Sequence, residues 1–197
     1  LPHPPNILAL HPHTLDEAWA DIRAVGQAIG RAPEADGLLE ALRARVLRVR
    51  DRVGASPARP RGFCLEWLAP LMTSGHWVPE MVEWAGGQEV LGRAGAPSRI
   101  VTWDEVAAAR PEIVIVMPCG FPVERTLTEL PQIARHPVWQ ALPAVRRGRV
   151  YAVNGPAYFQ AAGPRLVDGM ELLAAVLHPK RCGELMPQDA AVRVSTS

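Results

Sequence analysis

The sequence predicts an α/β protein built around a parallel sheet. From Gly62 onward, short apolar segments alternate with segments of helical periodicity, a pattern typical of parallel strands covered by helices on both faces. The clearest strand is Glu112–Met117, because Ile113–Val116 is a consecutive run of β-branched residues. Ahead of this part, the range Pro33–Val53 has the apolar spacing of one amphipathic helix, roughly 30 Å long.

Composition excludes several classes of protein. The chain has 197 residues, of which 48% are hydrophobic and 21% charged, close to the average of a folded globular chain. Its length is that of one domain, or of one domain and part of another. It has no run of about 18 apolar residues that would span a membrane. The formal net charge of +1 argues against nucleic acid as a partner, since such binding depends on excess positive charge.

The cysteines and the first residues carry no clear signal. Cys64, Cys119 and Cys182 are odd in number and far apart, so they give neither a disulfide framework nor a C-x-x-C metal or redox site. Leu1–Pro5 lacks the basic and apolar regions of a signal peptide, so none is visible in this sequence.

The N-terminal part is predicted to be one strand followed by one helix. Asn6–Leu10 is a short apolar run, and Pro12 ends it. The helix, Leu15–Ile29, begins with a capping box formed by Thr14 and Glu17.

The predicted strand at Asn6–Leu10 has no neighbour nearby in the sequence. A lone strand cannot satisfy its own backbone hydrogen bonds, so it either joins the later sheet or belongs to a domain whose remainder lies outside this sequence. We favour the second interpretation. It predicts an exposed apolar helix face around Trp19 and Ile22 unless a neighbouring chain covers that face.

The remaining elements follow from periodicity and from the placement of proline and glycine. The long helix has a basic outer face, which we interpret as solvated, and Ser56–Gly62 has the composition of a linker. From Pro179 onward we expect a polar, frayed tail. The apolar stripe of the long helix comprises Leu38, Leu39, Leu42, Val46, Val49 and Val53. The other predicted strands are Gly62–Trp67, Arg99–Val101 and Arg149–Val153, and the other helices are Val78–Ala85, Trp103–Ala109 (with Thr102 and Glu105 as capping box), Val123–Arg135 and Leu166–Leu177.

Ligands of open parallel sheets bind beyond the carboxyl ends of the strands, and this rule selects three loops. They are Leu68–Trp77, Pro118–Phe121 and Asn154–Gly163. Aromatic platforms with a few polar atoms suit a large, flat, partly apolar ligand. The rings that these loops offer are His76, Trp77, Phe121, Tyr158 and Phe159.

Each of these residues also has a purely structural interpretation. His76 would then cap the helix that starts near Val78, and Trp77 would belong to the core. Cys119 would be a small buried apolar residue, and Tyr158 with Phe159 would anchor a loop. His11 and His13 flank Pro12 and have the character of turn residues.

No established catalytic set is present. The sequence has no G-x-S-x-G elbow, no phosphate-binding P-loop and no H-E-x-x-H motif. The best enzymatic alternative is Cys119 with His76 as its base, since a thiol just before a helix can be activated by the helix N-terminus. No third orienting group is visible, so we assign neither catalytic residues nor metal ligands.

Several of these segments together resemble the cobalamin-binding solute-receptor family of ABC importers. The resemblance spans about residues 6 to 179 and depends on the combination of segments rather than on any one of them. The segments are Glu66–Met72, Ser74–Met81, Ala85–Gly87, Met117–Phe121 and Gly163–Leu166, with His11–Leu15 and Gly26–Gly30 in addition.

The resemblance implies two α/β lobes joined by one long helix, the type of fold shared by metal and cobalamin receptors. Residues 1–31 would be a remnant of the N-terminal lobe, 32–57 the linking helix, 58–180 the C-terminal lobe and 181–197 a tail. It further implies a non-enzymatic receptor, periplasmic or otherwise extracytoplasmic and membrane-associated. Such a receptor holds cobalamin between its lobes as a transported ligand, without a catalytic cofactor, and delivers it to a membrane permease.

The resemblance also implies a set of site residues. Docking in the family uses an acidic residue on each lobe, and the position in the C-terminal lobe is Gln160 here, with Glu80 or Glu83 as substitutes. Sister families bind haem, siderophores or metal ions, where His76 or Tyr158 would ligate iron. Because one wall of the cleft supplies only part of the buried ligand area, we expect this chain to bind its ligand weakly. The ligand-binding residues would be His76, Trp77, Cys119, Gly120, Phe121, Tyr158 and Phe159.

Overall fold

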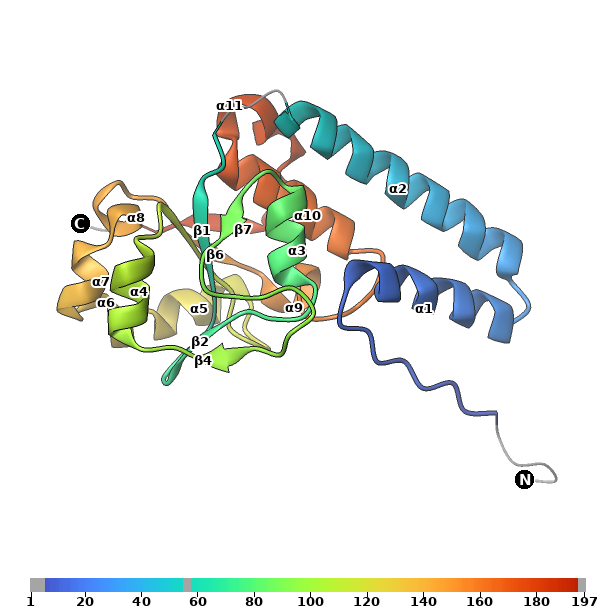
Figure 1. Ribbon diagram of the computed structural model, residues 1–197, viewed down its shortest axis with the longest axis horizontal. Helices are drawn as coiled ribbons and strands as arrows, with labels where there is room; N and C mark the ends of the chain where they lie inside the picture. Colours follow the sequence, from blue (N-terminus) through green and yellow to red (C-terminus); the bar gives the residue numbers. More distant parts are fainter. Residues whose placement is uncertain (1–5, 55–57, 195–197) are drawn as a thin grey trace.

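The computed structural model describes residues 6–54 and 58–194. A sheet carries helices on both faces, and a hairpin of two helices extends from one side of this body (Figure 1). The strands are β1 Arg61–Leu68, β2 Leu71–Thr73, β3 Gln88–Glu89, β4 Arg99–Ile100, β5 Ile113–Val116, β6 Val150–Val153 and β7 Ala191–Arg193. The α-helices are α1 Leu15–Ala28, α2 Ala32–Gly54, α3 Val78–Trp84, α4 Trp103–Ala109, α5 Val123–Glu129, α6 Pro131–Ala134, α7 Pro137–Ala141, α8 Pro143–Arg146, α9 Gly155–Tyr158, α10 Leu166–Leu177 and α11 Pro179–Cys182.

The centre of the sheet is parallel, as the sequence predicts. The strand order is β4-β2-β1-β5-β6-β7, and β3 pairs with β1. Strands β1, β5 and β6 run parallel to one another, with Gly62 opposite Ile113 and Val114 opposite Val150. Strands β2, β4 and β7 are antiparallel to their neighbours and complete the sheet on both sides. Three adjacent carboxyl ends therefore lie at one edge of the sheet.

Successive side chains of the central strands point to opposite faces of the sheet, so the apolar core is divided into two layers. Cys64 and Ile115 face the layer that contains α1, α2, α3 and α10. Phe63, Leu65 and Val114 face the opposite layer, which contains α4, α6, α7 and α8. Helix α10 is buried along nearly its whole length, because it lies between the sheet and α2. The sheet is thus covered on both faces, which is why its strands read as continuous apolar runs.

The two N-terminal helices form an antiparallel hairpin, and the predicted capping box at Thr14 is confirmed. The expectation of an exposed apolar face around Trp19 is wrong, because Trp19 is only 4% exposed and packs into the core with α2 and α10. Ile22 is half-buried instead. The apolar face that stays open lies farther along the hairpin, in a groove of about 420 Å³ lined by Leu10, Ile22, Val25, Ile29, Leu38 and Pro164.

The stripe predicted for α2 is confirmed except at Leu38. That side chain is 40% exposed, and Ala35 is buried in its place. Helix α1 approaches α2 so closely here that a Cβ on Gly26 would collide with Ala35. A small residue therefore faces the partner helix, and the larger Leu38 is left outside the contact.

Four other expectations about the elements are wrong. Asn6–Leu10 forms no strand and is exposed, since no described strand lies beside it. The predicted loop Leu68–Trp77 contains β2, and the helix Val123–Arg135 is divided into α5 and α6 ahead of Pro131, whose ring removes a backbone donor. The predicted tail is folded over its described part, which ends at residue 194: Cys182 is buried, and β7 pairs with β6. Part of the predicted linker Ser56–Gly62 lies outside the described residues.

One partly buried charge cluster ties α2 to α10. The Arg45 guanidinium donates to Asp168 at 2.6 Å and to both carboxylate oxygens of Glu171 at 2.6 and 3.0 Å. Hydrogen bonds of this charged kind contribute more than neutral ones, and one donor here satisfies two neighbouring acids.

We expect Arg45→Ala to lower the free energy of unfolding by roughly 1–3 kcal/mol, because it leaves two adjacent carboxylates without their counter-charge. Urea unfolding followed by circular dichroism measures the change. Arg43→Ala, on the exposed face of the same helix, serves as the control and should change the value by less than about 0.5 kcal/mol. Equal effects of the two substitutions would contradict a bracing role for Arg45.

Candidate functional site

The loops after the parallel strands meet at one edge and are joined by hydrogen bonds. The indole Nε1 of Trp77 donates to the carbonyl of Phe159 at 2.8 Å. The backbone N–H of Gly120 donates to Oε1 of Gln160 at 2.8 Å, and Nε2 of Gln160 donates to the carbonyl of Pro118 at 3.0 Å. The three predicted loops therefore form one connected surface.

His76 is held in an uncommon backbone conformation, with φ of 53°. Its N–H donates to the carbonyl of Ala96 at 2.6 Å, and its carbonyl accepts from Gly95 at 2.9 Å. The residue at the N-terminus of α3 is Trp77, and no side chain caps this helix, so the capping interpretation of His76 is wrong. The loop around residue 95 fixes the histidine instead.

Two of the predicted aromatic rings lie mostly inside the protein. Phe159 is 2% exposed and belongs to the core beneath α10, so it contributes its carbonyl to the surface rather than its ring. Phe121 is 7% exposed and is covered by Trp67, with ring centroids 5.3 Å apart, and by the guanidinium of Arg125 at 3.7 Å. Trp67 and Arg125, which the sequence did not single out, line a hollow of about 180 Å³ beside this pair.

Tyr158 and Cys119 are the more accessible members of the predicted set. Tyr158 is half-buried at the end of α9, with the guanidinium of Arg165 5.6 Å from its ring centroid. Cys119 is exposed, so its interpretation as a buried apolar residue is wrong. Gly120 follows it with φ of 76°, a conformation that favours glycine.

The candidate docking positions differ in how free their side chains are. Gln160 is engaged with three backbone groups, because its Nε2 also donates to Met117 at 3.3 Å. Glu80 accepts from the N–H of Leu15 at 2.9 Å, and burial raises the pKa of its carboxyl. Glu83 is exposed. Docking through any of the three stays a prediction.

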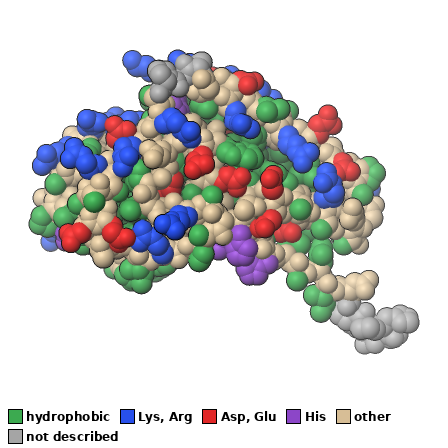
Figure 2. Space-filling model, in the orientation of Figure 1, with side chains coloured by type: hydrophobic (Ala, Val, Ile, Leu, Met, Phe, Trp, Pro, Cys, Tyr) green, Lys and Arg blue, Asp and Glu red, His purple; other side chains and the backbone are tan. Residues whose placement is uncertain are grey.

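A group of histidines lies beside the loops. Nδ1 of His13 is 3.0 Å from Nδ1 of His76, and the ring centroid of His13 is 4.7 Å from that of His11. Figure 2 shows histidine side chains gathered in one exposed patch at the lower edge of the view, with acidic side chains close by. The sequence interpretation of His11 and His13 as simple turn residues missed this contact, because 63 positions separate His13 from His76.

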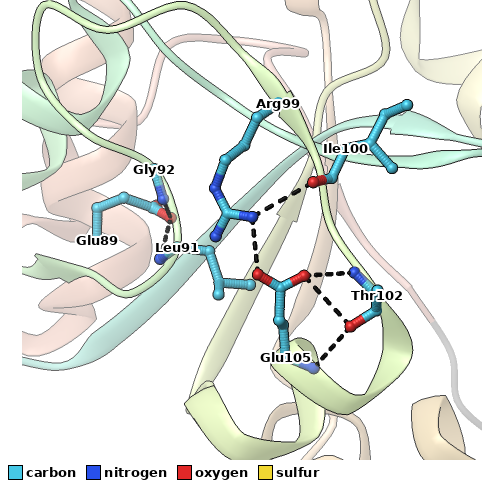
Figure 3. A network of polar contacts seen from close by, with 7 residues as sticks. All are labelled: Glu89, Leu91, Gly92, Arg99, Ile100, Thr102 and Glu105. Atoms are coloured by element: carbon cyan, nitrogen blue, oxygen red, sulfur yellow. Dashed lines mark hydrogen bonds and ion pairs between the residues drawn. The ribbon is translucent and has the colours of Figure 1, made fainter.

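A buried carboxylate supports the loop that holds His76. Glu89 accepts from the backbone N–H groups of Gly92 at 3.0 Å, Leu91 at 3.1 Å and Cys64 at 3.2 Å. Figure 3 shows its contacts with Leu91 and Gly92, next to the second capping box of Thr102 and Glu105. Burial raises the pKa of Glu89 to about 7, although its three hydrogen bonds act in the opposite direction.

The predicted enzymatic pair is not assembled in this structure. Among the hydrogen bonds of the described residues, none joins His76 to Cys119, and one ring nitrogen of His76 faces His13. Within residues 6–54 and 58–194, no group of three or more histidine, cysteine and acidic side chains is arranged to hold a metal ion. No helix in the same ranges is both long and apolar enough to cross a bilayer.

Comparison with known proteins identifies the class. The model of the periplasmic binding protein family matches residues 7–157, which is most of the chain. The chain therefore belongs to the periplasmic binding protein family. A search of curated proteins gives no match.

Solved structures share the fold. An ABC transporter substrate-binding protein from Listeria monocytogenes EGD-e superposes with a TM-score of 0.77 at 18% identity, over 86% of this chain and 67% of that one. A periplasmic heme-binding protein from Pseudomonas aeruginosa gives 0.73 at 19% identity, over 86% and 62%. IsdE of S. aureus, complexed with heme, gives 0.75 at 16% identity, over 84% and 66%. This chain thus spans 62–67% of the length of these proteins.

The raised pKa of the buried Glu89 carboxyl predicts how the free energy of unfolding depends on pH. Its pKa is about 7 in the folded protein against an ordinary value of 4.5, so the folded state binds more protons between these values. Stability contributed by the protonated form is therefore present below about pH 4.5 and is lost as pH rises to 7. Relative to Glu89→Gln, the unsubstituted protein should lose roughly 3 kcal/mol of unfolding free energy across this window.

Urea unfolding at several values between pH 4.5 and 8 measures this difference. Glu105→Gln is the control, because hydrogen bonding lowers the pKa of that exposed carboxyl. The difference in unfolding free energy between Glu105→Gln and the unsubstituted protein should stay constant above pH 5. If the difference for Glu89→Gln is also constant across this pH range, Glu89 is ionised in the folded protein throughout the range. That result would contradict the prediction.

Proposed function

We propose that this protein is the solute-binding component of an ABC importer, located outside the cytoplasm, and that the connected loop surface is one wall of its ligand site. Family membership and the similarity in fold to the ABC transporter substrate-binding protein of Listeria support the transport role. In this proposal α2 is the helix that links two lobes, residues 1–31 belong to the first lobe, and residues 58–180 form the second. The loaded protein would deliver its ligand to a membrane permease.

The observation that carries the proposal is the joining of three strand-end loops into one surface. The Trp77–Phe159 and Gln160–Gly120 hydrogen bonds fix the positions of these loops before any ligand arrives. A preformed surface lowers the ordering cost of binding. The proposed wall presents side chains or backbone of Trp67, His76, Trp77, Cys119, Gly120 and Tyr158, with Phe121 and Phe159 as support beneath it.

The proposed ligand is cobalamin or a related corrinoid. The wall combines aromatic faces with exposed polar atoms, which suits a large macrocycle that is apolar in its plane and polar at its rim. The sequence segments that resemble cobalamin receptors, Ser74–Met81 and Met117–Phe121 among them, form this wall.

Haem is the second candidate. The Pseudomonas aeruginosa protein is a periplasmic heme-binding protein, and IsdE is complexed with heme. Haem and the corrin of cobalamin are both flat metal-bearing rings. The accessible imidazole of His76 and the phenol of Tyr158 are groups that can ligate haem iron. The guanidinium of Arg125, next to the hollow near Trp67, would suit the carboxylates of haem.

Titration with cyanocobalamin and with hemin, followed by absorbance and calorimetry, tests the proposal. Because one wall buries only part of the ligand, we expect a dissociation constant of micromolar order or weaker. Trp67→Ala and Tyr158→Ala should each weaken binding by roughly 2- to 10-fold, since an aromatic contact is lost.

Trp103→Ala is the matched control, because Trp103 is also half-buried but stacks on His136, where α4 packs against α7. It should leave the affinity for either ligand unchanged. No binding of either macrocycle at roughly 100 μM would contradict the proposed ligand class. Loss of binding in Trp103→Ala equal to that in Trp67→Ala would contradict the proposed surface.

A further inference from the structure

The contact between His13 and His76 has the spacing of two ligands of one metal ion. Their Nδ1 atoms lie 3.0 Å apart. Two nitrogens that are each about 2.0–2.1 Å from a metal are roughly 3.0 Å apart when the angle between the bonds is near 90°. That angle belongs to square-planar and octahedral geometry, which Cu²⁺ and Ni²⁺ prefer, rather than to the tetrahedral geometry of Zn²⁺.

The backbones of both histidines are held in place by hydrogen bonds. His76 is fixed by its hydrogen bonds with Gly95 and Ala96. His13 precedes α1, and its N–H donates to the carboxylate of Glu17 at 2.6 Å. The first turn of α1 is in turn bound to α3, because Leu15 donates to Glu80. The fold therefore fixes the backbone positions from which the two imidazoles meet.

Acidic side chains lie near the pair (Figure 2). Glu17 lies beside His13, and Asp16 and Glu83 are close enough to Glu80 to raise the pKa of that carboxyl together with its burial. These groups come from the first turn of α1 and from α3, the two elements next to the histidines. Like-signed carboxylates at one place raise the local concentration of cations.

We propose that His13 and His76 chelate a late first-row transition-metal ion, Cu²⁺ or Ni²⁺, through Nδ1 of each ring. Without metal, one ring donates Nδ1–H to the other; on binding, that ring takes the tautomer with its proton on Nε2, so both Nδ1 lone pairs face the metal. Water completes the coordination, since these are two protein ligands only. The site does not require binding of a macrocycle.

Titration of the full chain with CuSO₄ and with NiCl₂ at pH 7.5, by calorimetry and by electron paramagnetic resonance for Cu²⁺, tests this site. We expect nitrogen hyperfine structure from two imidazoles and a loss of affinity of at least about tenfold in His13→Ala and in His76→Asn. Asparagine is chosen at position 76 because it tolerates the positive φ of that residue.

His136→Asn is the matched control, because His136 caps α7 on the far side of the sheet. It should bind Cu²⁺ with the affinity of the unsubstituted protein. Thermal unfolding of each variant shows whether it is folded. Folded His13→Ala and His76→Asn proteins that retain Cu²⁺ affinity within roughly twofold would overturn the proposal, as would a spectrum that does not change in either variant.

Discussion

The arrangement of β1, β5 and β6 as adjacent parallel strands is the constraint on which the rest of the structure depends. Their register places Gly62 beside Ile113 and Val114 beside Val150, so the three strands end at one edge. Three loops are thereby brought together, and Trp77 and Phe159, which are 82 positions apart, are joined by a hydrogen bond. The helices on both faces and the α1–α2 hairpin stabilise this sheet, and the candidate site is a consequence of it.

The surface formed by the loops is fixed by polar contacts that lie under or beside it. Gln160 joins the loops after β5 and β6, Trp77 joins the start of α3 to Phe159, and Glu89 holds the segment that supports His76. A binding protein gains affinity from such pre-organisation, because less conformational freedom is lost when the ligand binds.

The sequence predicts the parts of this fold that local chemistry determines. The capping boxes at Thr14 and Thr102, and the buried strand β5, are confirmed because their signals lie within a few residues. Strands β2 and β7 were missed, since each is only three residues long and is stabilised by pairing with a distant strand. The meeting of the three loops was predicted from the order of the strands, and their role as the ligand site stays a proposal. Which rings are exposed was not predictable, because the burial of Phe159 and the contact of His76 with His13 depend on segments remote in sequence.

Amide hydrogen exchange with and without cyanocobalamin or hemin tests most directly whether the joined loops are the ligand surface. We predict slower exchange on ligand addition in residues 66–77, 118–121 and 154–162, with little change along the open groove between α1 and α2. Protection confined to that groove, or spread over β7 and α7 instead, would contradict it.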